Sequence, residues 1–316
     1  MPAYSRYASI QEESSFGTGA GSTYLFDIAG ETLQRKPVFS LQEPERLMGA
    51  LAQYEQRRSV QGSLDLFTGW EGLGRVLKGV SRAPTTTSAG GGYYTHTFTP
   101  APNTSITTWT VDIPREADTH RFTGMAAKAG RMSFGVGETH FGVSLDMIGK
   151  DEAGVGSIAS VSASSFEAAM PIIGATTLTL ITGATTWTGA FQSVDVNFKS
   201  GRRLIMPDRY ATPARIVDEG YWEASIKVKS IYWTDTDPLL AAFRSRAALS
   251  ATLAFASGSY AFSVALPACR INGTPPTIKG PGYRNIELLI DAQALLSSSI
   301  NAPIGFTLTN TTSSYA

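Results

Sequence analysis

Apolar and polar residues alternate one by one in several short segments of the chain. A period of two places every second side chain on the same face of an extended strand, so these segments are predicted to be strands with one buried face. Glycines and prolines separate them, as is usual for turns between strands. The segments with this pattern are Ser63–Phe67, Trp109–Ile113, Phe141–Met147, Val194–Phe198, Ala224–Val228, Tyr260–Leu266 and Ile286–Ile290.

Two segments have the signals of short helices. Thr68 is placed to cap a helix over Gly69–Lys78, with Glu71 three residues later as in a capping box. Asp237 is placed to cap a helix over Pro238–Arg246, because proline is well tolerated at the first helical position. Each predicted helix directly follows an alternating strand.

Four segments recur in the same order in the two halves of the chain, which indicates a tandem duplication. The matched pairs are Val38–Ser40 with Val196–Phe198, Ser63–Leu66 with Ser225–Val228, Trp109–Pro114 with Phe262–Pro267, and Val143–Met147 with Ile286–Ile290. The predicted fold class is therefore all-β, with two tandem β-sandwich or half-barrel domains and one short helix in each.

The predicted domain boundaries follow from this repeat. A small-residue stretch at 151–165 is typical of a linker. The prediction comprises an N-terminal arm (1–30), a first domain (31–150) with a long polar loop (41–60), the linker, and a second domain (166–316) with a long polar loop (199–220). The arm and the loops are expected to reach neighbouring subunits and to become ordered there.

Charge and composition exclude several classes of protein. Only 16% of the 316 residues are charged, and Lys+Arg and Asp+Glu balance at 26 each. A zero net charge argues against binding nucleic acid through overall charge, while 42% hydrophobic residues argue against disorder. The zero net charge also permits self-association, because it lowers the repulsion between copies of the chain. Cys269 is the single cysteine, so an internal disulfide and a cysteine-based metal site are excluded.

The chain shows no targeting or membrane pattern. Its start lacks the charged and then apolar regions of a secretory signal. The most apolar stretch, Ala168–Ala184, is interrupted by Pro171 and Gly174, so we expect no membrane span and no membrane partner.

No pattern of catalytic, cofactor-binding or metal-ligating residues stands out. The three histidines, His96, His120 and His140, lack metal-ligand spacing, and there is no G-x-S-x-G motif. Asp235–Asp237 is interpreted as a helix cap rather than a cation site. Gly90–Gly92 is interpreted as a loop tip, because the Lys-Ser/Thr of a phosphate-binding loop is missing. We predict neither an enzyme nor a bound cofactor.

The order of these features resembles one known family. Residues Glu13–Thr18 read E-S-S-F-G-T, a strand at Val38–Ser40 leads into a long polar loop, and Leu73–Gly79 follows an L-x-x-[LV]-[LM]-x-G pattern. This arrangement is similar to that of the tail tube proteins (major tail proteins) of long, non-contractile-tailed bacteriophages. The second half departs from it, since its arm, Phe166–Thr188, has no F-G-T.

The resemblance implies a structural virion protein of a siphophage-like tail, assembled in the host cytoplasm. Family members form rings that stack into a hollow tube, in which one sheet of each domain joins a continuous barrel around the lumen. Two domains per chain imply a homotrimer that mimics a hexamer. The implied partners are other copies of the chain, the tape-measure protein, tail terminator and baseplate proteins, and DNA in transient, non-specific passage.

Charged residues receive roles within this interpretation. A tube that conducts DNA should lack basic patches on the wall of its lumen. Asp65, Asp146 and Glu287 lie on the polar faces of predicted strands, so these acidic residues are predicted to face the lumen. Lys227 does not fit this interpretation. Contacts between rings are predicted for charged residues of the long loops. These are Glu43, Glu45, Arg57, Arg58, Arg202 and Arg203.

Two alternatives stay open at this point. A tail terminator or baseplate hub protein would have the same fold but form a single ring. A carbohydrate-binding β-sandwich would be a stable monomer, with Tyr93, Tyr94, Trp109 and Trp187 as candidate surface aromatics.

Overall fold

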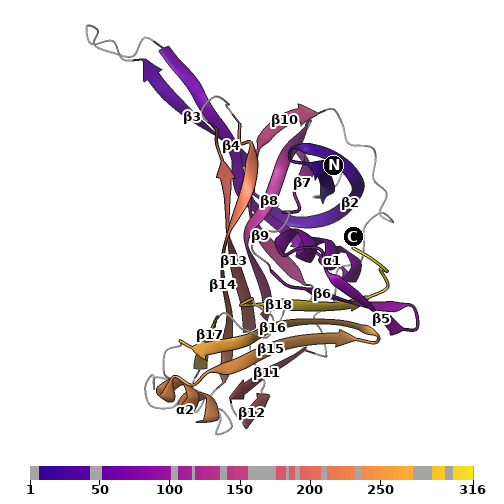
Figure 1. The fold of residues 1–316 in the computed structure, drawn as a ribbon, viewed down its shortest axis with the longest axis vertical. Coiled ribbons are helices and arrows are strands. Elements are labelled where there is room, and N and C mark those ends of the chain that lie inside the picture. Colours follow the sequence, from indigo (N-terminus) through magenta and orange to yellow (C-terminus); the bar gives the residue numbers. More distant parts are fainter. Residues whose placement is uncertain are drawn as a thin grey trace, which may run out of the picture.

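A computed structural model gives the fold of the chain (Figure 1). The residues that it describes are 7–42, 52–100, 106–115, 118–135, 141–155, 176–182, 185–188, 193–207, 212–231, 237–272, 287–295 and 302–315. Strands dominate them, which confirms the all-β class, and each alternating segment of the sequence overlaps a strand.

The elements of the first half are β1 (Tyr7–Ser15), β2 (Thr18–Glu31), β3 (Gln34–Gln42), β4 (Ala52–Phe67), α1 (Trp70–Val80), β5 (Thr85–Gly90), β6 (Tyr93–Phe98), β7 (Trp109–Arg115), β8 (Asp118–Gly135), β9 (Gly142–Gly149) and β10 (Asp151–Val155). Those of the second half are β11 (Thr176–Thr182), β12 (Thr185–Thr188), β13 (Ser193–Ile205), β14 (Arg215–Ile231), α2 (Asp237–Ser245), β15 (Leu249–Ser257), β16 (Tyr260–Ile271), β17 (Glu287–Ala294) and β18 (Gly305–Asn310).

Both predicted helices are present, but the N-terminal cap of α1 differs from the prediction. Gly69 is the N-cap of α1 and provides no side-chain hydrogen bond. Glu71 instead accepts hydrogen bonds from Thr311 and Thr312 near the C-terminus. The capping box was therefore wrong as a local interaction, because a distant segment uses the same carboxylate.

The strands of the two halves pair in the same order. In the first half the order is β2-β1-β7-β8-β9-β4-β3, and in the second half it is β12-β11-β15-β16-β17-β14-β13. All of these pairs are antiparallel. By this order β7 corresponds to β15, so the sequence match of Trp109–Pro114 with Phe262–Pro267 was displaced by one strand.

Two junctions join the halves. β8 pairs with β13, from Ala129↔Lys199 to Gly135↔Ser193. The C-terminal strand β18 lies between β16 and β6, so a strand pair of the second half continues into the β5–β6 hairpin of the first.

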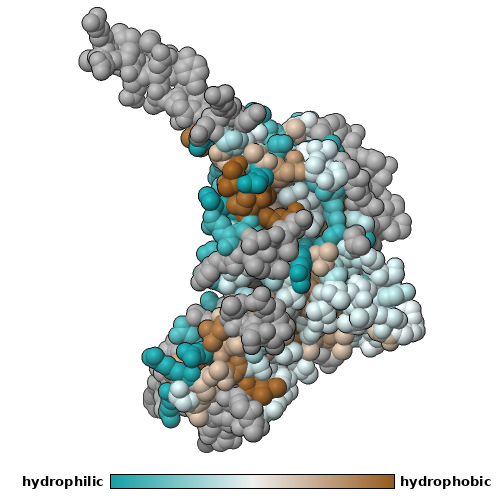
Figure 2. Space-filling view, viewed as in Figure 1, coloured by the Kyte–Doolittle hydropathy of each residue, from teal (hydrophilic) through white to brown (hydrophobic). Residues whose placement is uncertain are grey.

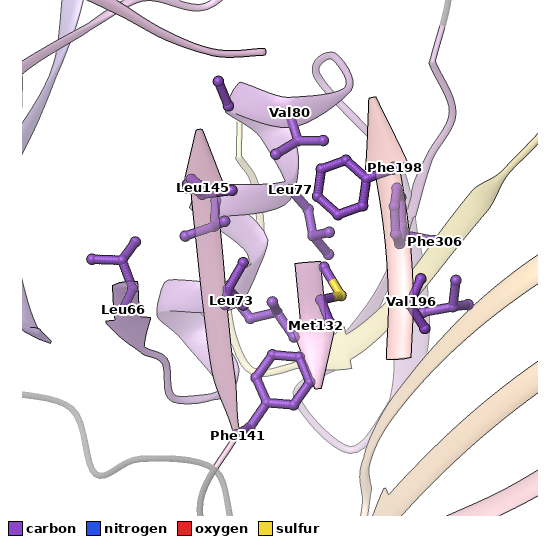
Figure 3. Close-up of a cluster of buried hydrophobic side chains, with 14 of the residues drawn as sticks. Leu66, Leu73, Leu77, Val80, Met132, Phe141, Leu145, Val196, Phe198 and Phe306 are labelled. Atoms are coloured by element: carbon purple, nitrogen blue, oxygen red, sulfur yellow. The ribbon is translucent and has the colours of Figure 1, made fainter. Parts of the chain in front are cut away.

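One hydrophobic core extends across both halves (Figure 3). Leu73 and Leu77 of α1 point toward Leu145 of β9 and Met132 of β8, and Phe198 of β13 lies beside Val80. These side chains are at most 3% exposed. The inward residues of the alternating strands therefore bury the apolar face of the helix, as the period of two predicts.

The predicted N-terminal arm is part of this core instead of a free arm. β1 pairs with β2 and β7, and Ala8, Ile10, Phe26 and Ile28 are buried. The prediction failed because the polar residues between these positions concealed the buried face of a hairpin.

The two predicted long loops and the linker also differ from the prediction. Residues 52–60 and 199–205 lie in strands, because the loops 41–60 and 199–220 are largely the ends of the hairpins β3–β4 and β13–β14. Figure 1 shows the β3–β4 hairpin projecting from the body. Asp151–Val155, assigned to the linker, forms β10 against β8, and residues 156–165 are outside the described part of the chain.

The described surface has no large apolar strip in the view of Figure 2, where hydrophobic atoms form separate small patches. The large hydrophobic side chains that are exposed lie on different elements. They are Val38, Phe67, Ile181 and Leu295.

Candidate functional site

A long sheet runs through both halves of the molecule. Its order is β3-β4-β9-β8-β13-β14-β17, and the β8–β13 pair joins the two halves within it. Figure 1 shows β13 and β14 running along the long axis, with β8 and β9 beside their upper part. The chain thus builds one uninterrupted surface from its two halves.

The two faces of this sheet differ in character. Leu64, Leu145, Met132, Val196 and Ile226 are buried on one face and belong to the core. The residues that alternate with them form the other face, which is called the polar face below. Most of its described members are polar, although the exposed Phe67 of β4 also lies on it. The described members are Ser63, Asp65, Phe67, Gly142, Ser144, Asp146, Ala129, Arg131, Ser133, Ser193, Asp195, Asn197, Lys199, Glu223, Ser225, Lys227 and Lys229.

The charges of the polar face compensate one another. Arg131 donates to Asp195 Oδ1 at 2.9 Å, and Ser133 donates to the same oxygen at 2.7 Å. Lys199 Nζ lies 3.6 Å from Glu223 Oε2, and Lys227 is directly opposite Asp195 in the strand register. Arg131, Lys199 and Lys227 therefore have acidic neighbours, although the sequence interpretation could not accommodate Lys227.

The polar face is hollowed where the two halves meet. An open hollow of about 770 Å³ lies over β8, β9, β13 and β14. Its polar lining includes Arg131, Ser144, Asp146, Asn197, Lys199, Glu223 and Ser225. The mixed signs of this lining give it no surplus of positive charge with which to retain a polyanion.

The E-x-x-F-G-T segment has a structural role next to this sheet. Glu13 Oε2 accepts hydrogen bonds from the Gly17 N–H and the Thr108 hydroxyl, both at 2.8 Å. Its Oε1 accepts from the Thr110 hydroxyl and the Gly124 N–H, also at 2.8 Å. Glu13 thus ties the β1–β2 turn to β7 and β8.

Phe16 and Gly17 of the same segment determine the conformation of the β1–β2 turn. Gly17 has φ +82°, a conformation that side chains rarely adopt, and a Cβ there would lie 2.7 Å from the Lys150 side chain. Lys150 Nζ lies 5.5 Å from the centre of the Phe16 ring. The segment therefore fixes how β1 and β2 enter the fold.

Comparison of the chain with models of known families gives its family. The model of the family described as phage tail tube protein matches residues 6–307. The chain belongs to the phage tail tube protein family. A search of curated proteins gave no match. Membership makes the protein a structural component of the phage virion tail, in a family that is generally non-enzymatic.

The three residues predicted to face the tail tube lumen occupy different positions. Asp65 and Asp146 both lie on the polar face, and Asp65 accepts a 2.5 Å hydrogen bond from the Ser144 hydroxyl. Glu287 begins β17 opposite Ile231, and its side chain lies outside the described residues. The structure therefore brings two of the three together on one surface.

The residues predicted to join tail tube rings are also dispersed. Glu43 and Glu45 lie outside the described residues. Arg57 is exposed on β4, whereas Arg58 pairs with Asp151 of β10 at 2.8 Å. Arg203 pairs with Glu219 on the β13–β14 hairpin.

Arg202 does not lie on the tail tube subunit's surface, which corrects its assignment to ring contacts. It is 2% exposed. Its Nη1 donates to Gly79 O at 2.7 Å and Ala127 O at 2.9 Å, and its Nη2 donates to Val80 O at 2.7 Å. Burial lowers the pKa of Arg202 to about 10, so the guanidinium stays charged at neutral pH.

This guanidinium from the second half binds the C-terminal end of α1 in the first half. The last carbonyls of a helix lack partners within the helix and carry partial negative charge, so a cation is favourable there. Asp218 Oδ2 lies 3.7 Å from Arg202 Nε and supplies a counter-charge. Sequence reasoning missed this role, because an Arg-Arg pair in a polar segment is typical of a surface.

Three further residues that the sequence analysis considered are buried. His96 is buried, with Nδ1 2.9 Å from Thr86 Oγ1 and Nε2 2.9 Å from Thr312 O, and burial lowers its pKa. Cys269 is a buried strand residue, as expected, and burial raises its pKa to about 12. Trp109 is 2% exposed and so is not the surface aromatic that the carbohydrate-binding alternative requires.

Within the described part of the chain, no cluster of three or more His, Cys, Asp or Glu side chains could hold a metal ion. Asp235 and Thr236 lie outside that part. Gly90–Gly92 form the tip of the β5–β6 hairpin, with positive φ at each residue. No helix among the described residues is long and apolar enough to cross a membrane.

Proposed function

We propose that this chain assembles into stacked rings that form the hollow tail tube of a siphophage-like virion, with the polar face lining the lumen. The observation that carries the proposal is the long sheet, which runs through both halves and bears a charge-compensated, hollowed polar face. A channel that passes DNA needs a wet surface without a basic patch. Asp65 and Asp146 are the proposed lumen residues on the described part of this face, and Glu287 is proposed from its strand.

We further propose that the chain is a duplicated tail tube subunit, in which the first domain, predicted at 31–150, also takes in β1, β2 and β10, and the second domain is 166–316. The common strand order of the two halves supports this division, and β10 moves the boundary to after Val155. A ring of six such domains then needs three chains, so the proposed assembly is a homotrimer with pseudo-hexameric symmetry.

The proposed partners follow from a tube of this kind. The lumen would enclose the tape-measure protein and later conduct DNA, while the ends of the tube would meet tail terminator and baseplate proteins. Assembly is proposed to occur in the host cytoplasm. The β3–β4 hairpin with Arg57 is a proposed contact between rings, because it projects from the body (Figure 1). The exposed Arg203 of the β13–β14 hairpin is the other proposed contact.

Negative-stain electron microscopy of the purified protein across a concentration series tests the proposal. We expect tubes, or rings whose end views show three strong and three weaker lobes. Lone rings that never stack would favour a terminator or baseplate hub. A chain that stays monomeric at all concentrations, even with its tape-measure protein, and is retained on a glycan column would contradict the proposed function.

A further inference from the structure

The outer edge of β3 is blocked by side chains. β3 pairs with β4 along one edge, and no other described strand pairs with its opposite edge. Amide groups of an extended segment alternate between its two edges. Thr32, just before β3, donates its N–H to Ser63 O of β4, so the N–H groups of Leu33 and Arg35 and the nitrogen of Pro37 point to the opposite side. That side would be open to another strand if nothing covered it.

Two carboxylates and a guanidinium form hydrogen bonds with the backbone groups of this edge. The Leu33 N–H donates to Glu31 Oε2 at 2.9 Å, and the Arg35 N–H donates to Glu152 Oε2 at 3.1 Å. Arg115 Nη2 donates to Leu33 O at 2.5 Å. Pro37 has no N–H to offer. A strand could pair here only after these side chains had moved away.

The same side chains hold one another in place. Arg115 Nε and Nη2 donate to the two oxygens of Glu31 at 2.9 and 2.7 Å. His120 Nδ1 lies 2.7 Å from Glu152 Oε1, and Arg115 Nη1 lies 4.0 Å from the same oxygen. Glu31 and Glu152 are each 18% exposed and Arg115 is 30% exposed, so the group is close enough to solvent to rearrange.

The second half shows what covers the corresponding edge when a strand is available. β13 occupies the place of β3 in the pairing order, and its outer edge is paired with β8 over Ser193–Lys199. The counterpart of β8 in the second half is β16, whose end has β17 on one side up to Ile271 and β15 on the other side up to Cys269. Arg270 and Ile271 are therefore the residues of β16 that extend beyond its pairing with β15. One copy of the chain therefore has a β8-like strand end and a β3 edge, at opposite ends of the long sheet.

We propose that Glu31, Arg115 and Glu152 form a removable cap over the edge at which a second copy of this chain adds its β16 end. The inference rests on the proposed assembly into rings. In the free subunit the cap satisfies the Leu33 and Arg35 N–H groups and prevents premature strand pairing. In the ring, the neighbouring strand takes over these hydrogen bonds and the charged side chains turn to solvent.

The double variant Glu31→Ala, Glu152→Ala tests this cap. Its matched control is Glu12→Ala, Asp112→Ala, which removes the same charge from two ion pairs, with Lys78 and Arg121, that do not contact this edge. Removing the carboxylates raises the free energy of the free subunit but not of the ring. We expect the lowest protein concentration that supports assembly, followed by light scattering, to fall about tenfold for the cap variant, the order expected from one hydrogen bond to a charged group. The control should match the parent.

Amide hydrogen exchange at Leu33–Lys36 provides a second measurement, because it reports on opening at this edge; exchange in the core strands shows whether the variant is destabilised as a whole. We expect faster exchange in the free cap variant than in the free parent, and equal protection of both after assembly. The cap is refuted, and the proposed function stands, if the parent assembles but the variant needs the same protein concentration to assemble and its Leu33–Lys36 amides stay unprotected in the assembly. If the parent forms no ring or tube at all, the proposed function fails and the cap fails with it.

Discussion

Single residues account for the features that the sequence made conspicuous. Glu13 is the first letter of E-x-x-F-G-T, and its carboxylate accepts four hydrogen bonds from three separate segments. The motif therefore has a structural role in this chain, because it fixes the first hairpin against β7 and β8. The sequence could predict that this segment matters, but the partners at Thr108, Thr110 and Gly124 are distant in the chain.

We predict that Glu13→Ala lowers the free energy of unfolding by roughly 3 kcal/mol, since it leaves two backbone N–H groups and two hydroxyls without their acceptor. Urea unfolding followed by tryptophan fluorescence measures the loss. The control is Glu223→Ala, which removes one partner of an exposed ion pair and should cost less than about 1 kcal/mol. Equal losses for the two variants would contradict the role of Glu13.

Arg202 shows where residue-level prediction fails. Alternation along a strand tells which side chains share a face, and it correctly placed Asp65 and Asp146 on the polar face. Alternation does not show that the carbonyl groups at the C-terminal end of a distant helix lie next to a strand, where a cation can bind them. Composition and spacing do not predict such a contact, because Arg202 lies in the second half of the chain and the end of α1 lies in the first half.

At the scale of elements, strands with clear alternation were predictable and polar hairpins were not. The segments of β7, β9 and β16 show uninterrupted alternation and were identified from sequence. The N-terminal hairpin and the ends of β3–β4 and β13–β14 carry polar residues on both faces, so they were interpreted as an arm and as loops. Only their pairing with neighbouring strands shows that they are regular elements.

The N-terminal hairpin provides a prediction at this scale. Deletion of residues 1–20 removes β1, which pairs with both β2 and β7 and contributes Ala8 and Ile10 to the core. We therefore expect this deletion to abolish cooperative unfolding, whereas an arm that serves only assembly would leave it intact. Thermal unfolding followed by circular dichroism makes the measurement, with deletion of residues 1–5, which precede β1, as the control.

At the scale of the whole molecule, the repeat in the sequence agrees with the order of strand pairing. Three of the four matched segments fall on corresponding strands, and the fourth is displaced by one strand because β7 and β16 have similar alternation. The sequence could not show that the halves join through β8 and β13 into one sheet, since that contact depends on a register between distant strands. The hollow on the polar face arises from this junction and was equally hidden.

The central claim is that the polar face of the long sheet lines the lumen of the tail tube. Cryo-electron microscopy of the assembled protein, with the map resolved to individual strands, tests it most directly. The account predicts that β4, β9, β8, β13 and β14 surround the channel, with Asp65, Asp146 and Lys227 pointing into it. A map in which this face lies on the outer wall, or is buried between subunits, would contradict the account.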